Sequence, residues 1–139
     1  MAETKSEITL EALDENLEAA QEFVRNQVEP LCNDTSIQLQ LDLVVEEIFV
    51  NIAHYAYAPQ TGSVTITCKV STEPARLTVS FADSGKPFNP LEKPDPDVTL
   101  SSEERSIGGL GIFLVKKYMT SVNYDYKDGK NIFTLTRDL

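Results

Sequence analysis

The stretch SIGGLGIFLV, at positions 106–115, carries the residue types of a phosphate-binding turn. Gly108, Gly109 and Gly111 stand directly before an apolar run, and glycine lets the main chain come close to a ligand. A helix that begins there offers unpaired N–H groups to anions. The stretch therefore indicates a phosphate cradle, although a glycine-rich turn that enters a helix is more often purely structural.

A second set of polar residues recurs at helical spacing further upstream. Glu47, Asn51 and His54 follow one another by four and three residues, which places a carboxylate, a carboxamide and an imidazole on one helix face. That face is either an ordinary solvated face or the wall of a partly buried pocket in which these groups do chemistry. An apolar stripe at the same spacing on this helix consists of Leu41, Val45, Ile48, Ile52 and Tyr55.

An aspartate–glycine turn ends an apolar strand. Leu77, Val79 and Phe81 alternate up to Asp83, and Gly85 follows two residues later. The simpler interpretation is a β-turn in which the aspartate bonds its own backbone. The alternative is that Asp83 accepts a hydrogen bond from a ligand amine at the end of the strand.

The elements that must position these groups follow from the hydrophobic periodicity. The first half of the chain predicts an edge strand over about 6–11 and a helix that Asp14 caps and Pro30 ends. Thr35 or Ser36 is the predicted N-cap of a second helix that reaches about residue 57. Strands follow at about 63–71 and 76–82, joined closely enough to form an antiparallel hairpin.

The second half of the chain predicts one more helix and two more strands. Ile112, Val115 and Met119 mark one face of the helix, and the strands occupy about 121–127 and 131–137. Between the Asp83 turn and the glycine stretch lies a Pro-rich and acidic connection, about 89–107. Connections of this length are usually lids, binding loops or disordered segments.

Length and charge restrict the class of protein. The 139 residues predict one domain, 1–139, and the formal net charge of −10 disfavours nucleic acid as a partner. No apolar run is long enough for a leader or a membrane span, so a cytoplasmic protein is expected. Cys32 and Cys68 match no C-x-x-C spacing, and neither zinc nor a disulfide framework is indicated.

Three motifs stand in a fixed order: E-x-x-x-N at 47–51, D-x-G-x-x-F at 83–88, and G-G-L-G-I-F-L-V at 108–115. This order resembles the GHKL, or Bergerat-fold, ATPases, and the length is similar to that of their anti-sigma factor serine kinases. The resemblance implies an α/β two-layer sandwich with helices on one face of a mixed, mostly antiparallel sheet. It also implies that ATP lies between the helices and a lid at about 89–107.

The resemblance assigns roles on the second helix. Asn51 would ligate Mg²⁺, a hard cation that prefers oxygen ligands. Glu47 would be the general base that accepts the proton of a substrate serine or of water. Glu46 points about 100° away on the helix. His54 falls among further pocket residues.

The same resemblance places the adenine and phosphates. Asp83 would accept from the adenine amine, with Gly85 leaving room for the ring and Phe88 completing the motif. Arg105 would contact either the phosphates or a partner protein, and Thr134 is a candidate for a minor adenine or water contact. The residues implied at the phosphates are Arg105, Gly108, Gly109, Leu110 and Gly111.

The function implied is that of an ATP- and Mg²⁺-dependent serine/threonine kinase. It would phosphorylate a STAS-type anti-anti-sigma protein and otherwise sequester a sigma factor, with a homodimer as the favoured assembly. No helix pair with a phospho-accepting histidine is present in the sequence, which excludes a complete sensor histidine kinase. The alternative is a nucleotide-sensing interaction module that transfers no phosphate.

Overall fold

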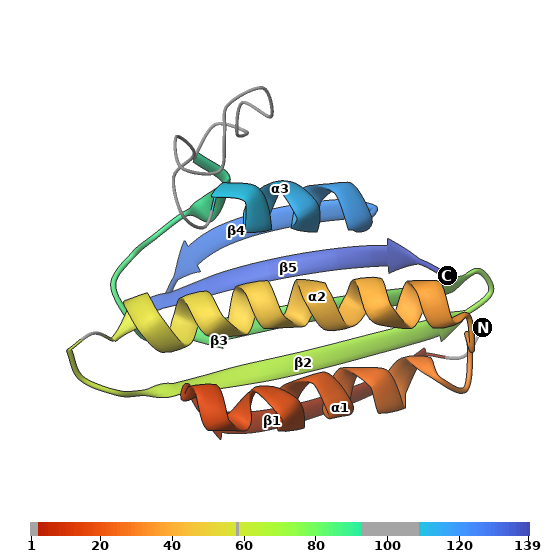
Figure 1. The fold of residues 1–139 in the computed structure, drawn as a ribbon, viewed down its shortest axis with the longest axis horizontal. Coiled ribbons are helices and arrows are strands. Elements are labelled where there is room, and N and C mark those ends of the chain that lie inside the picture. Colours follow the sequence, from red (N-terminus) through yellow and green to blue (C-terminus); the bar gives the residue numbers. More distant parts are fainter. Residues whose placement is uncertain (1–2, 58, 93–108) are drawn as a thin grey trace.

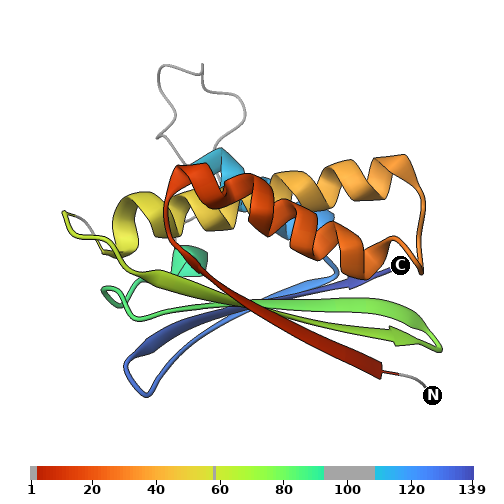
Figure 2. The ribbon, with the colours of Figure 1, turned by 90° about the horizontal axis from the view of Figure 1, so that it is seen from below.

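The protein folds into two layers, a five-stranded sheet and three helices that cover one of its faces (Figures 1 and 2). A computed structural model describes residues 3–57, 59–92 and 109–139. The sheet order is β1-β2-β3-β5-β4, and each of the four pairings is antiparallel. The two-layer sandwich is confirmed, whereas the mixed component expected of the sheet has no counterpart among the described strands.

The strands alternate buried and exposed side chains, as a sheet with one covered face requires. Val64, Ile66 and Cys68 on β2 face the helices, and Phe133 and Leu135 do so on β5. β1 is an edge strand, as predicted. The strands are β1 (Glu3–Glu11), β2 (Ser63–Thr72), β3 (Ala75–Asp83), β4 (Ser121–Lys127) and β5 (Lys130–Asp138).

α2 lies at the centre of the helical layer, between α1 and α3 (Figure 1). Its buried face includes Val44, Val45 and Phe49, which join the core formed with the strands. None of the helices in the described ranges has the length and apolar character needed to cross a bilayer. The helices are α1 (Leu17–Val28), α2 (Thr35–Asn51) and α3 (Gly109–Tyr118), with 3₁₀ turns at Asp14–Asn16 and Pro90–Glu92.

Two predicted helix caps are wrong. The α2 N-cap is Asp34, whose carboxylate accepts from the backbone N–H groups of Ser36 and Ile37, rather than Thr35 or Ser36. An aspartate one residue earlier competes for the same N–H groups and carries the charge that a helix N-terminus favours. Asp14 caps nothing, because it opens a short 3₁₀ turn and its side chain faces His54 instead.

The end of α2 departs from regular helix. Residues Ile52–Ala56 form a π-helical turn, which holds more residues per turn than an α-helix. Tyr55, predicted to continue the apolar stripe, is therefore displaced from it and is 63% exposed. The earlier stripe residues Leu41, Val45, Ile48 and Ile52 are buried as predicted.

Cys68 provides a prediction about stability and pH. Burial raises the pKa of its thiol from 9.0 to about 12. Above pH 9 the unfolded chain loses this proton while the folded chain keeps it, so the free energy of unfolding falls as pH rises from about 9 towards 12. A full shift of this size corresponds to at most about 4 kcal/mol.

Urea unfolding of the wild type and of Cys68→Ala at pH 8 and pH 10.5 measures this contribution. The wild type should lose about 2 kcal/mol more than the variant between the two pH values. Both chains carry the same tyrosines and lysines, whose titration cancels in the comparison. An equal loss in the two chains would show that the Cys68 thiol makes no such contribution.

Candidate functional site

Glu47 and Asn51 form a hydrogen-bonded pair on α2. The Asn51 side-chain nitrogen donates to Glu47 Oε1 at 2.9 Å, across one helical turn, and both residues are partly buried. The bond uses the amide nitrogen of Asn51, which leaves its carbonyl oxygen able to ligate a cation. The predicted proximity of these two side chains is confirmed.

The Glu47 carboxylate packs directly against the backbone of Gly111, in the first turn of α3. A Cβ atom at this glycine would lie 1.9 Å from Glu47 Cδ and within 2.2 Å of both carboxylate oxygens. The carboxylate therefore occupies the space that any other residue at position 111 would fill. Gly109 begins α3 and Leu110 follows it, while Gly108 and Arg105 lie outside the described residues.

Asp83 lies at the end of β3 and is 6% exposed. Its Oδ1 accepts from Gly85 N at 2.9 Å and from Asn131 Nδ2 at 3.0 Å. Within the described chain both bonds of this carboxylate go to Oδ1, so Oδ2 keeps its capacity to accept. The Asx-type turn and an acceptor for a ligand, two alternatives in the sequence, are thus compatible with each other.

Asn131 is the site residue that the sequence predictions missed. Besides Asp83, its amide nitrogen donates to Lys86 O at 2.8 Å, and its Oδ1 accepts from Phe88 N at 3.0 Å and from the Tyr124 hydroxyl. It is 6% exposed. Its signal was available, since Asn131 is a carboxamide on the strand face that otherwise carries Phe133 and Leu135.

Thr134, the residue proposed earlier on this strand, is on the other face. It alternates with the buried Phe133 and Leu135, so its side chain lies on the sheet surface that no helix covers. It does not line the cavity described below. The suggested adenine or water contact of Thr134 is therefore wrong.

The turn after Asp83 is fixed to the end of α2. A Cβ atom at Gly85 would lie 2.3 Å from the backbone oxygen of Ala56, which also accepts from Lys86 N at 2.9 Å. The Tyr57 hydroxyl accepts from Ser84 N at 2.7 Å and donates to a carbonyl on β2 at 2.6 Å. Only glycine permits so close an approach of the two backbones.

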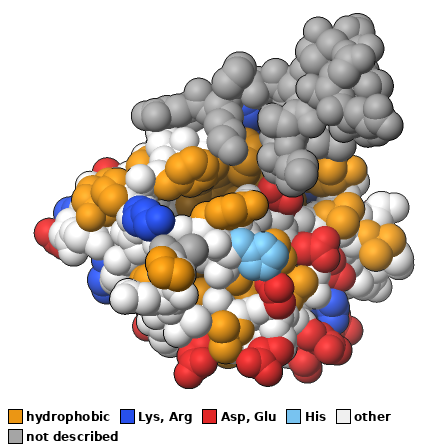
Figure 3. All heavy atoms as spheres, turned by 60° about the vertical axis from the view of Figure 1, so that its left-hand side comes forward, with side chains coloured by type: hydrophobic (Ala, Val, Ile, Leu, Met, Phe, Trp, Pro, Cys, Tyr) orange, Lys and Arg blue, Asp and Glu red, His pale blue; other side chains and the backbone are white. Residues whose placement is uncertain are grey.

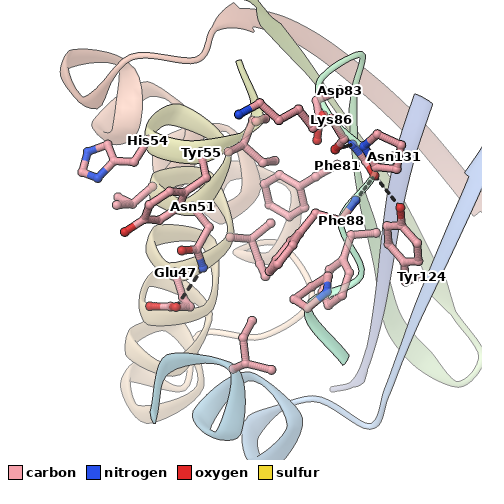
Figure 4. Close-up of a pocket in the computed structure, with 18 residues that line it drawn as sticks. Glu47, Asn51, His54, Tyr55, Phe81, Asp83, Lys86, Phe88, Tyr124 and Asn131 are labelled. Atoms are coloured by element: carbon pink, nitrogen blue, oxygen red, sulfur yellow. Dashed lines mark hydrogen bonds between the residues drawn. The ribbon is translucent and has the colours of Figure 1, made fainter. Parts of the chain in front are cut away.

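A cavity of about 530 Å³ lies between these groups (Figures 3 and 4). Glu47 and Asn51 stand at one end and Asp83 and Asn131 at the other, with Phe88, 51% exposed, between them. The Asp83 end suits a flat ring that carries a hydrogen-bond donor, and the Glu47–Asn51 end suits a charged part of the same ligand. The apolar walls include Ile48, Val50, Ile52, Phe81, Ile112 and Phe133.

His54 lies at the rim rather than among the polar groups. Its imidazole points away from the cavity in Figure 4, and Nε2 is 2.8 Å from both carboxylate oxygens of Asp14. Both side chains are substantially exposed. The structure thus brings Glu47 and Asn51 together but directs His54 towards the loop that precedes α1.

Asn51 is the predicted ligand for the expected cation, and the described residues add no metal-binding cluster around it. They contain no group of three or more His, Cys, Asp or Glu side chains that could hold a metal ion. A Mg²⁺ ion at Asn51 would therefore take its remaining oxygen ligands from phosphates and water, which is its usual coordination in nucleotide sites. The described residues around the cavity would therefore hold such a cation only together with a ligand that brings further oxygen atoms.

The sequence is similar to that of a known kinase. The sequence is 27% identical over 101 residues to the serine/threonine-protein kinase BtrW of Bordetella bronchiseptica, covering 72% of this chain and 70% of that protein. This relative is named as a kinase, in agreement with the predicted resemblance to kinases of the GHKL type.

Two solved structures share the fold at 15% identity. The RsbU and RsbW domains of Rv1364c from Mycobacterium tuberculosis align with a TM-score of 0.68 over 98% of this chain and 32% of that longer chain. The SiaB–SiaC complex from Pseudomonas aeruginosa aligns with a TM-score of 0.58 over 95% of this chain and 89% of that one. The model of the histidine kinase-like ATPase domain matches residues 9–137, and the chain belongs to that family.

Proposed function

We propose that this protein is an ATP- and Mg²⁺-dependent serine/threonine kinase and anti-sigma factor. It phosphorylates a STAS-type anti-anti-sigma protein and otherwise sequesters a sigma factor. The observation that carries the proposal is one cavity with a buried carboxylate, Asp83, at one end and the Glu47–Asn51 pair at the other. The kinase name of the Bordetella relative and the RsbW domain in the Mycobacterium structure support it.

The Asp83 end reads the base. Asp83 Oδ2 accepts from the exocyclic amine of adenine, and the close packing of Gly85 on Ala56 holds the turn that follows this carboxylate. Phe81 and Phe88 contribute aromatic surface, and apolar burial supplies affinity while the carboxylate supplies specificity.

The α2 end handles the phosphates. A bound Mg²⁺ neutralises phosphate charge during transfer. Asn51 offers the cation its side-chain oxygen, and Glu47 accepts the proton of the attacking serine hydroxyl. Backbone N–H groups from Gly108 to Gly111, with Arg105, are proposed as the remaining phosphate contacts.

Phosphorylation also explains partner exchange. A phosphoserine carries about −1.5 to −2 charges at neutral pH. This protein has a formal net charge of −10, so it repels the phosphorylated partner and retains the unphosphorylated one. The alternative, a nucleotide-sensing module without transfer, shares the base and phosphate contacts but does not need the proton acceptor Glu47.

The Asp83→Asn substitution tests the base-binding end. Since Oδ1 is committed to two donors, the asparagine must place its oxygen there and its NH₂ group where Oδ2 was. The NH₂ group then opposes the amine of adenine and suits the O6 acceptor of guanine. We expect calorimetry with Mg²⁺ to show about 10- to 100-fold weaker ATP binding and a smaller preference over GTP.

The control is Asp125→Asn, which removes the same charge at an exposed position on β4. It should leave ATP affinity unchanged, and the thermal midpoint of Asp83→Asn shows whether the fold is retained. Unchanged ATP affinity in Asp83→Asn would exclude the base-reading role. If the wild-type chain bound no ATP at millimolar concentration with Mg²⁺, the whole proposal would be wrong.

Glu47→Gln separates the kinase from the nucleotide-sensing module. Glutamine retains an oxygen that can accept from Asn51 but cannot take up the serine proton. We expect ATP affinity within about threefold and phosphotransfer at least about 100-fold slower, measured with γ-labelled ATP and a STAS-type acceptor. Equal transfer by the variant would exclude Glu47 as the base.

Gly111→Ala tests the contact between α3 and the carboxylate. The atoms nearest to the new methyl group belong to the flexible end of the Glu47 side chain, so the fold should survive while the carboxylate moves. A displacement near 1 Å at a reacting group can cost about 100-fold in rate. We expect that loss in phosphotransfer, with ATP affinity retained.

Glu47→Asp supplies the matching background, because its shorter side chain withdraws the carboxylate from position 111. The rate penalty of Gly111→Ala should be several-fold smaller in this background than in the wild type, as coupled residues show. Equal penalties in both backgrounds would mean that Gly111 acts independently of Glu47.

A further inference from the structure

Glu47 also borders a second cavity, distinct from the one already described. This smaller cavity, about 140 Å³, lies where α2 and α3 run side by side (Figure 1). Among the residues that the structure describes, Glu47 alone lines both cavities. The carboxylate therefore separates the proposed nucleotide site from a neighbouring space.

The walls of the smaller cavity are mostly apolar. α2 contributes Leu43 and Val44, and α3 contributes Leu114, Val115 and Tyr118. A cavity of about 150 Å³ lined by apolar side chains holds a group as large as benzene. The α2–α3 cavity is therefore large enough for one aliphatic side chain.

The mouth of this cavity carries an exposed leucine and an exposed carboxylate. Leu43 is 48% exposed, and Glu46 beside it is exposed as well. A single exposed leucine needs no explanation. One that borders an apolar cavity next to a proposed catalytic base offers a binding surface.

Gly111 forms the wall that the cavity shares with the base. It lines the cavity, and the absence of a Cβ atom there lets the Glu47 carboxylate lie against α3. Because Glu47 lines the cavity as well, a group held there lies beside both the Gly111 backbone and the Glu47 side chain.

We propose that the α2–α3 cavity binds the phosphoacceptor protein through one aliphatic side chain adjacent to its acceptor serine. This inference rests on the proposed kinase function. With nucleotide in the large cavity, a serine hydroxyl must reach Glu47 from another direction. The α2–α3 cavity is the other space that opens beside this carboxylate in the described part of the chain.

Phosphate transfer to a serine at that position forms one bond and breaks another. The serine oxygen forms a bond to the terminal phosphorus, and the bond between this phosphorus and the ADP oxygen breaks, with its electron pair leaving on ADP. Glu47 takes the hydroxyl proton and later returns it to solvent. The products are phosphoserine and ADP.

The same cavity favours release of the product. The unmodified serine is neutral, whereas phosphoserine brings about −1.5 to −2 charges next to Glu46 and Glu47. The negative phosphate and these two neighbouring carboxylates repel one another. The proposed docking surface therefore discriminates between substrate and product through two carboxylates on α2.

Two leucines on α2 provide a matched experiment. Leu43→Glu places a carboxylate at the cavity mouth. Leu39→Glu makes the same change one turn earlier, at a leucine that is 59% exposed and does not line the cavity. The probe is a STAS-type protein that the wild-type chain phosphorylates, and the measurements are its KM and the ATP Kd.

We expect Leu43→Glu to raise the KM for the acceptor at least about tenfold, as removal of an interface anchor does. Its ATP Kd should remain within about twofold, because Leu43 does not line the nucleotide cavity. Leu39→Glu should leave both quantities within about twofold. Leu43→Asn, which adds no charge, should raise the KM in the same direction and serves if the glutamate variant fails to fold.

The measurements distinguish a failure of the docking surface from a failure of the kinase function. An unchanged KM in the Leu43 variants, with transfer by the wild type intact, would overturn the docking surface and leave the kinase function standing. An equal rise in KM for Leu39→Glu would show general charge repulsion and would also overturn it. If the wild type transferred phosphate to no STAS-type probe, the kinase function and the docking surface would fall together.

Discussion

The buried carboxamide of Asn131 is the constraint on which the Asp83 end of the cavity depends. It joins the end of β3, the turn after it and β4 through bonds to Asp83, Lys86, Phe88 and Tyr124. A buried polar group left without a partner costs about 1–3 kcal/mol. Because each bond helps to satisfy another, the network has one stable arrangement, and Asp83 has one orientation within it.

The other end of the cavity is held in a different way. Among the described residues, Glu47 has one side-chain hydrogen bond, from Asn51, and a packing contact with a glycine backbone on α3. Its carboxylate can therefore adjust to what enters on either side. A rigid end suits recognition of one fixed group, whereas an adjustable carboxylate suits a proton acceptor that two molecules approach.

Much of the fold could be predicted from sequence because the strands alternate cleanly and each turn carries its own signal. The pairing of Glu47 with Asn51 could also be predicted, since helical spacing fixes it. A carboxamide on the apolar face of β5 marks Asn131 as unusual, but its partner could not be predicted because the pairing depends on register. It lies directly opposite Asp83 in the β3–β5 pairing, which alternation within either strand cannot reveal. The extra residue of the π-helical turn, which exposes Tyr55, likewise leaves no mark in the apolar spacing.

The contact between Gly85 and Ala56 has a further consequence, because Ala56 continues the helix that carries Glu47. The two ends of the cavity are thus attached to one continuous helical segment, at Glu47 and at Ala56, which are nine residues apart. In the proposed function, a nucleotide with its base at the Asp83 turn would reach Glu47 through its terminal phosphate, so this helical segment would set the distance between the two contacts.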